Sequence, residues 1–145
     1  MKNEIIIDAI EQINKGDVAC IVIEGDTITY KEKGRGVKPI LTLCKRGVLN
    51  NVCVVDKVVG KAAAMVMTYA GVKMCYAITI SKHALKWFED YGVIVKYDNL
   101  VEYIVNRRGD GMCPMECATK ELEDDRDIVY VLQSKLKELS YYSNN

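Results

Sequence analysis

One histidine and one close cysteine pair are, by residue type, the groups of this 145-residue chain best suited to catalysis. His83 is the sole histidine, and no nucleophile-elbow sequence accompanies it, so a Ser-His-Asp triad is not indicated. Cys113 and Cys117 are spaced as C-x-x-x-C, which differs from the C-x-x-C of thioredoxin-like sites, and no second pair completes a zinc site. The sequence therefore predicts no metal and no cofactor, and it favours a surface or helix-capping role for His83.

A second candidate site is Gly34-Arg35-Gly36, which precedes a short predicted helix with Pro39 in its first turn. Backbone N–H groups in such a turn form a nest that attracts phosphate, and the helix N-terminus adds positive potential. Arg35, Gly36 and Lys38 are therefore candidate ligand-binding residues. The glycines match no complete phosphate-loop motif, so a solvated basic face is the alternative.

The composition describes one globular domain spanning residues 1–145. Half of the residues are apolar, and 20 basic residues balance 20 acidic ones, which excludes intrinsic disorder and disfavours a generally basic nucleic-acid binder. Charge is nevertheless uneven, because residues 31–46 are mainly basic and residues 121–127 mainly acidic.

The chain shows no targeting or membrane signal. Asp8 interrupts the apolar run Ile5-Ile6-Ile7, so no signal peptide is predicted, and no apolar run approaches the ~18 residues of a membrane span. We therefore expect a cytoplasmic protein with reduced cysteines. Cys20, Cys53 and Cys75 lie in apolar runs, where a free cysteine behaves as a small hydrophobic residue.

The elements that must position these residues alternate between helix and strand. Apolar spacing predicts a helix over Ile6–Ile13, and Gly25-Asp26 predicts a hairpin turn between strands Val18–Glu24 and Thr27–Lys33. The later pattern predicts a helix Val37–Cys44, a strand Val52–Val55, a helix from Lys61 to Gly71 and a strand Lys73–Ile80. Next come a helix capped by Ser81, with an apolar stripe of Ala84, Phe88 and Tyr91, and a buried strand Val93–Val95. The pattern ends with a helix through Leu100, Ile104 and Val105 that stops at Arg107-Arg108-Gly109, and with a last helical region from Cys113 to Leu139. This order predicts a three-layer α/β/α domain with a mixed sheet.

This layout resembles an uncharacterised prokaryotic family known only as a domain of unknown function, whose structural relatives are the cytidine-deaminase-like proteins. The most specific parts are Gly60-Lys61-Ala62-Ala63-Ala64 and Gly111-Met112-Cys113-Pro114-Met115-Glu116, with Gly36-Val37-Lys38-Pro39 as a third. The resemblance covers nearly the whole chain, and it implies a cytidine-deaminase-like fold.

The resemblance also implies that the zinc chemistry of the deaminases is absent. Those enzymes begin one core helix with His-Ala-Glu, which supplies a zinc ligand and a proton shuttle, and the next with Pro-Cys-x-x-Cys. The corresponding stretches here are Lys61-Ala62-Ala63 and Ser81-Lys82-His83-Ala84, so the ligands and the acid–base residue are missing together. Zinc-dependent deamination is therefore not expected.

If the place of the lost metal remains a pocket, Lys61 could supply the missing positive charge and, with Gly60, hold an anion. Cys113, if its loop folds back to that point, would be a candidate nucleophile or redox-sensing thiol, and Glu116 a candidate acid–base group. Each residue has an ordinary alternative: an exposed lysine, a packed thiol and a first-turn acid that stabilises its own helix.

Two functions follow from these residues. The first is a cytoplasmic, zinc-free protein that binds a small anionic metabolite, with enzymatic turnover left open; only the resemblance implies that this metabolite is nucleotide-related. The second is a non-catalytic interaction or structural protein with a vestigial pocket. Deaminase-like folds often assemble, so a homo-oligomer is expected, and the hairpin edge over residues 18–33 is a candidate for pairing between subunits. Neither reading involves a membrane or a nucleic acid.

Overall fold

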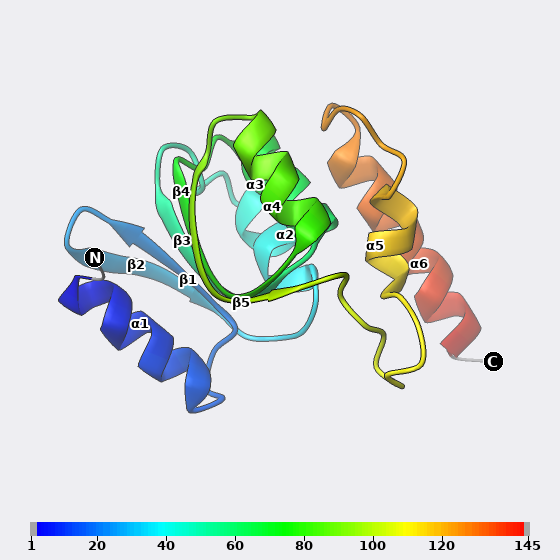
Figure 1. Ribbon diagram of the computed structural model, residues 1–145. Coiled ribbons are helices and arrows are strands. Elements are labelled where there is room, and N and C mark those ends of the chain that lie inside the picture. The colour runs from blue at the N-terminus through cyan, green and yellow to red at the C-terminus, as the bar shows by residue number, and fades with distance from the viewer. Residues whose placement is uncertain (1–2, 144–145) are drawn as a thin grey trace.

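One mixed sheet organises the molecule in the computed structural model, which describes residues 3–143. The strand order is β2-β1-β3-β4-β5 (Figure 1). β1 is antiparallel to both of its neighbours, whereas β3, β4 and β5 run parallel. The strands are β1 (Cys20–Glu24), β2 (Thr27–Glu32), β3 (Cys53–Val59), β4 (Met74–Ser81) and β5 (Ile94–Val101). The predicted α/β class with a mixed sheet is confirmed.

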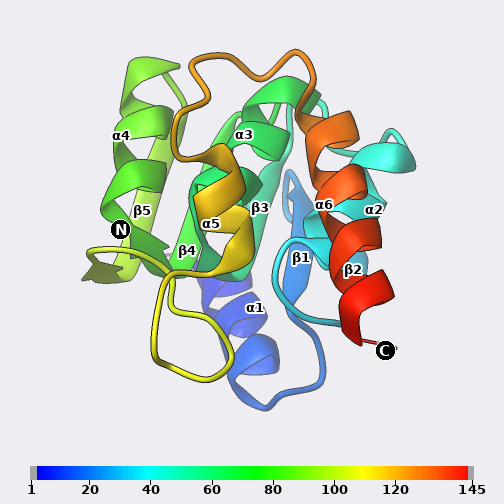
Figure 2. The same ribbon diagram turned by 90° about the vertical axis from the view of Figure 1, so that its right-hand side faces the viewer.

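Helices cover both faces of the sheet (Figure 1, Figure 2). α1 (Glu4–Asn14) packs on one face through an apolar cluster that includes Ile6, Ile10 and Ile13. The larger core lies on the other face, beneath α2 (Lys38–Lys45), α3 (Lys61–Ala70) and α4 (Lys82–Asp90), and α5 (Pro114–Thr119) and α6 (Ile128–Ser143) stack outside α3. Within residues 3–143, no helix has the length and hydropathy needed to cross a bilayer.

Side-chain caps and one glycine set the helix boundaries. The Asn3 side chain accepts a hydrogen bond from the Ile6 N–H at 3.0 Å, and the Ser81 hydroxyl accepts one from the Ala84 N–H at 3.2 Å. Each bond satisfies a backbone donor that the helix itself leaves free. Gly71, with φ of 88°, takes the left-handed conformation that ends α3. The start of α4 and the end of α3 are therefore as predicted.

The regular pairing of the three parallel strands is interrupted at one level of the sheet, at Ile78 of β4. The pairing of β4 with β3 and with β5 omits this residue in both ladders. Val54 and Val59 are five residues apart in β3, and Cys75 and Ile80 are five apart in β4, yet all four belong to the larger core. Because a regular strand alternates its faces with a period of two, the strands change face at this point. In β3 and β4 the change keeps the last residues, among them Val59 and Ile80, buried beneath the helices that follow.

The predicted helix through Leu100, Ile104 and Val105 is wrong. Leu100 lies in β5, and residues 102–113 form a loop in which the Asn106 N–H donates to the Gly111 carbonyl at 2.8 Å. The Asn106 side chain accepts hydrogen bonds from the N–H groups of Gly109 and Asp110 at 2.8 and 3.2 Å. A local side-chain acceptor of this kind favours a turn over a helix, and it outweighs the apolar spacing.

Three other expectations need correction. The strand predicted as a buried Val93–Val95 is the longer β5, which forms an edge of the sheet and is largely exposed. In α4, the residue that joins Ala84 and Phe88 in the core is Trp87, whereas Tyr91 is 45% exposed. The last helical region is split into α5 and α6 by a turn at residues 120–127, which is rich in acidic residues.

Asp56 is a buried carboxyl in the middle of β3. It is 3% exposed and lies directly opposite Cys20 of β1. Burial raises the pKa of Asp56 to about 8, while the hydrogen bond from the Lys57 N–H, at 2.9 Å, acts to lower it. Burial, together with the nearby Asp56 carboxyl, also raises the pKa of Cys20 and of Cys75, so these two thiols stay protonated.

Replacing Asp56 by Asn should remove a pH dependence of stability. The folded protein keeps this carboxyl neutral up to about pH 8, whereas the unfolded chain loses the proton above its ordinary pKa of 3.8. Unfolding therefore releases a proton between these two values, and the free energy of unfolding falls as the pH rises, by up to about 1.4 kcal/mol per pH unit. Urea unfolding at about pH 5 and about pH 7.5 measures this slope, which the Asp56→Asn variant should lose; equal slopes in both proteins would contradict the prediction.

Candidate functional site

Two helices begin side by side at the carboxyl end of the parallel strands. β3 leads through Gly60 into α3, and β4 ends at Ser81, the N-cap of α4. Gly60 is required there by close approach, since a Cβ on this residue would lie 2.6 Å from the Glu116 Oε1 atom. The sheet topology thus brings the starts of α3 and α4 to one point, and a carboxylate from α5 occupies it.

The Glu116 carboxylate is buried at this junction, with 3% of the residue exposed. Its Oε1 accepts from the Lys61 N–H at 2.6 Å and from the Ser81 hydroxyl at 3.2 Å, and its Oε2 accepts from the Ile104 N–H at 3.0 Å. The Ser81 oxygen in turn accepts from the Ala84 N–H. The negative charge therefore lies at the N-termini of both helices, where the backbone dipoles stabilise it.

The Lys61 side chain points to the segment that follows α5. Its Nζ atom donates to the Lys120 carbonyl at 3.0 Å and to the Leu122 carbonyl at 2.7 Å, and it lies 5.4 Å from the centre of the Trp87 ring. Desolvation lowers the pKa of Lys61, and the neighbouring acidic side chains, Glu121 first, oppose this shift. The ammonium group thus binds backbone oxygens of this chain.

Further contacts hold the 120–127 segment along α3 and α4. The Thr68 hydroxyl lies 2.7 Å from Asp125 Oδ2 and accepts from the Trp87 indole N–H at 2.9 Å. The Tyr91 hydroxyl donates to the Glu123 carbonyl at 3.1 Å, and its ring stacks on Trp87 at 4.3 Å between centroids. Together with Glu116 and Lys61, these residues attach the C-terminal helices to the sheet-bearing part of the molecule.

The loop before Cys113 reaches the start of α3 through Ile104, whose N–H bonds the Glu116 carboxylate. The Cys113 N–H donates to the Ile104 carbonyl at 2.7 Å, and the half-buried thiol packs against the larger core. Cys117 is exposed, with its sulfur 3.9 Å from the Met112 carbonyl oxygen. The structure thus brings Gly60, Lys61 and Glu116 together in direct contact and places Cys113 at the N-cap of the same short helix as Glu116.

The other candidate ligand residues lie elsewhere. Arg35, Gly36 and Lys38 follow β2, and β1 separates β2 from β3, where α3 begins. Gly36 has φ of 61°, and α2 begins at Lys38 without a side-chain cap. None of the three contacts the Glu116 carboxylate among the hydrogen bonds of residues 3–143. Within the same residues, no three His, Cys, Asp or Glu side chains gather as metal ligands would.

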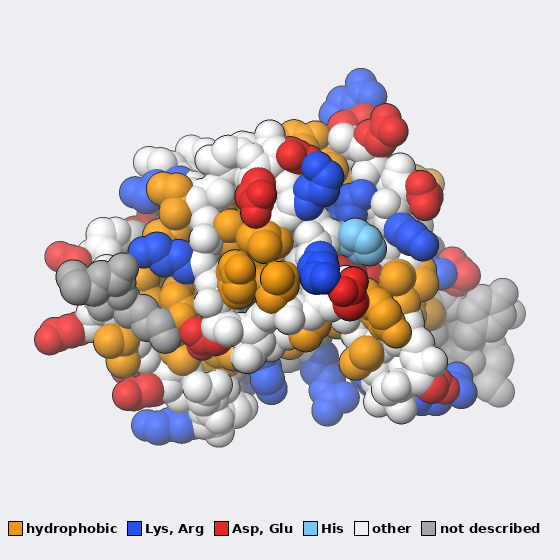
Figure 3. Space-filling view, viewed as in Figure 1, with side chains coloured by type: hydrophobic (Ala, Val, Ile, Leu, Met, Phe, Trp, Pro, Cys, Tyr) orange, Lys and Arg blue, Asp and Glu red, His pale blue; other side chains and the backbone are white. Residues whose placement is uncertain are grey.

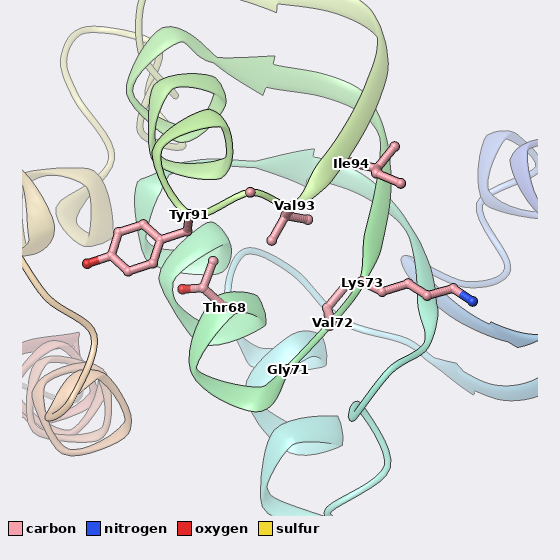
Figure 4. Close-up of a pocket in the computed structure, with 8 residues that line it drawn as sticks. Thr68, Gly71, Val72, Lys73, Tyr91, Val93 and Ile94 are labelled. Atoms are coloured by element: carbon pink, nitrogen blue, oxygen red, sulfur yellow. The ribbon is translucent and has the colours of Figure 1, made fainter.

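A shallow depression lies at the opposite end of α3 (Figure 4). Thr68 and Gly71 from the end of this helix line it, together with residues at the starts of β4 and β5. The Lys73 and Tyr91 side chains point away from one another in Figure 4, so their polar ends do not converge. Ligand sites combine concave walls with converging polar groups, and this depression lacks the second feature.

Sequence reasoning missed the partners of Glu116. The Ile104 N–H became available because the segment around it is a loop, where a helix was expected. Ser81 was identified as a helix cap, but its second bond joins residues 35 positions apart and has no local signal. The one signal in the sequence was Gly60, since a glycine before a strong helix indicates a close approach of another group.

Replacing Glu116 by Gln should destabilise the protein by about 2 to 3 kcal/mol, because the amide NH₂ would face a backbone N–H donor and the charge at both helix starts would be lost. Urea unfolding measures the change. Glu11 is an exposed glutamate on α1, and Glu11→Gln is the matched control, expected within about 0.5 kcal/mol of wild type. Equal losses in the two variants would contradict the assigned role.

Replacing Lys61 by Met should cost about 1 to 2 kcal/mol, because the carbonyls of Lys120 and Leu122 would lose their donor. The loss should be accompanied by faster amide hydrogen exchange in residues 120–127, measured by mass spectrometry. Lys137→Met changes an exposed lysine of α6 and serves as the control. Unchanged exchange in the Lys61 variant would show that its ammonium does not hold this segment.

The comparisons with known proteins agree with this architecture. Residues 8–136 match the model of a domain of unknown function, DUF1893. The crystal structure of a DUF1893 family protein from Thermotoga maritima is similar, with 30% identity and a TM-score of 0.81 over 93% of this chain and 92% of that chain. The curated proteins contain no match. The family match covers most of the sequence, and on this basis the chain belongs to the DUF1893 family.

Proposed function

We propose that this protein is a non-catalytic interaction protein, and that the start of α3 is a structural junction rather than a ligand pocket. The observation that carries the proposal is the buried Glu116 carboxylate, which accepts three hydrogen bonds at the convergent starts of α3 and α4. An anion at this point would need the same donors. The place that the deaminase resemblance gives to a bound group is thus filled by the chain itself.

The Lys61 side chain supports the same reading. An ammonium that held a substrate anion would present free donors to solvent, but this one binds two carbonyls and lies over the Trp87 ring. Releasing it would break an exposed hydrogen bond to the Lys120 carbonyl and a part-buried one to the Leu122 carbonyl, so the penalty of about 1 to 3 kcal/mol for an unsatisfied buried group is an upper bound that concerns the Leu122 oxygen alone. Glu116 binds the start of α3, and Lys61 binds the segment after α5, so the two side chains together hold the C-terminal helices against α3.

A second candidate function is the binding of a small anion, such as a nucleotide phosphate, after withdrawal of Glu116. The specific observation in its favour is the donor set, because two backbone N–H groups and a serine hydroxyl suit any oxyanion. Cys113 would then be the nearest candidate thiol. This function requires a diffusible anion to displace the Glu116 carboxylate from its three hydrogen-bond donors.

Anion titrations separate the two functions. Isothermal calorimetry with inorganic phosphate and with AMP should detect no saturable binding to the wild-type protein at millimolar concentrations. In Glu116→Ala the three donors remain without their acceptor, so acetate or phosphate should raise the melting temperature of this variant, but not that of wild type or of the Glu11→Ala control.

Saturable binding of phosphate or AMP to the wild-type protein, weakened by Lys61→Met, would overturn the non-catalytic proposal and support the second function. If Glu116→Ala does not fold, the same titrations of wild type and of Lys61→Met still decide the question.

A further inference from the structure

Exposed apolar side chains are concentrated along β5 and the loop after it. Among the described residues, five of the nine large hydrophobic side chains that are strongly exposed fall within residues 94–105: Ile94, Tyr97, Leu100, Tyr103 and Val105. Figure 3 shows hydrophobic side chains gathered on this face of the molecule, with basic and acidic ones between them. A concentrated apolar surface beside a free strand edge is typical of an interaction site.

Among residues 3–143, no strand pairs with the outer side of β5, so backbone donors and acceptors at its centre are available there. The Ile94 N–H donates inward to the carbonyl of Lys73, the residue just before β4, so in the regular part of the strand the backbone groups of Val95 and Tyr97 point away from the sheet. The other edge, β2, presents the exposed Lys31 and pairs with β1 across a bulge, and both features protect an edge from pairing. β5 is therefore the better candidate edge.

The side chains of β5 are self-complementary about Tyr97. If two copies of β5 meet antiparallel with a two-fold axis at Tyr97, Lys96 lies opposite Asp98 of the partner subunit. Leu100 pairs with Ile80 of the larger core and therefore lies on the same face of the sheet as Tyr97, whereas Ile94 pairs with Met74 on the other face. An axis at Lys96 would oppose two ammonium groups, and an axis at Asp98 would oppose two carboxylates, which destabilises cross-strand pairs. The irregular pairing at Asp98 confines backbone bonding to the centre, around Tyr97, and leaves the outer contacts to side chains.

We propose that the protein forms a homodimer through β5, with the two-fold axis at Tyr97. This inference rests on the proposed function and names its partner as a second copy of the same chain. The Tyr97 N–H and carbonyl groups of the two copies bond reciprocally, two Lys96–Asp98 pairs flank them, and the exposed Leu100 side chains extend the apolar contact on the face that carries Tyr97. Such isologous contacts are the usual basis of a symmetric dimer.

Sedimentation equilibrium from low to high micromolar concentration should detect a dimer for wild type. Leu100→Glu should raise the dissociation constant at least ~tenfold by placing a charge in the apolar contact, whereas Tyr130→Glu, on the exposed part of α6, should not change it.

Lys96→Glu should weaken the dimer by about tenfold, because it opposes a carboxylate to Asp98 of the partner subunit. The Lys96→Glu/Asp98→Lys double variant exchanges the charges and should restore dimerisation.

A wild-type monomer throughout this range, or a dimer that Leu100→Glu leaves unchanged, would overturn the interface. A folded double variant that stays monomeric while wild type dimerises would overturn the assigned register. Asp98 also bonds to the Tyr76 hydroxyl, so circular dichroism must show that the double variant is folded. These outcomes are independent of the phosphate titrations, so the interface and the non-catalytic proposal fail separately.

Discussion

A buried carboxylate at two helix N-termini is the interaction on which the rest of this structure depends. Parallel strands β3 and β4 end at the same edge of the sheet, so α3 and α4 necessarily start close together and present unpaired N–H groups to one point. Such a point requires an acceptor, and water cannot supply it once α5 covers the site. Glu116 supplies both the acceptor atoms and the negative charge, and Gly60 leaves room for it.

This arrangement explains why the same residues hold the C-terminal helices in place. Glu116 reaches from α5 to the start of α3, and Lys61 reaches from α3 to the chain just after α5, so each segment neutralises polar groups of the other. The Glu116 carboxylate and the Lys61 ammonium are both bound by groups of this chain, so the junction does not need a ligand. This is the physical basis for proposing an interaction protein.

Local patterns predicted most of the secondary structure, because the helices α1 to α4 and the hairpin carry their own signals: apolar spacing, the Ser81 cap and the left-handed glycine after Ala70. The failures fall where a local acceptor or tertiary burial decides. The Asn106 side chain turned an apolar stretch into a loop, and the position of β5 at the sheet edge exposed residues expected to be buried. Of the candidate site, Gly60, Lys61 and Glu116 were identified by type and position, whereas their contacts were not.

The sequence by itself determined the α/β class, the helix that begins at Lys61 and the glycine that precedes it, since propensities and caps act over a few residues. Only the tertiary structure decided that Glu116, 55 positions from Lys61, fills the junction of two helices, and that the Lys61 ammonium binds carbonyl oxygens. Hydrogen bonds over such separations depend on how the sheet orders its strands, and no local pattern of residues encodes that order.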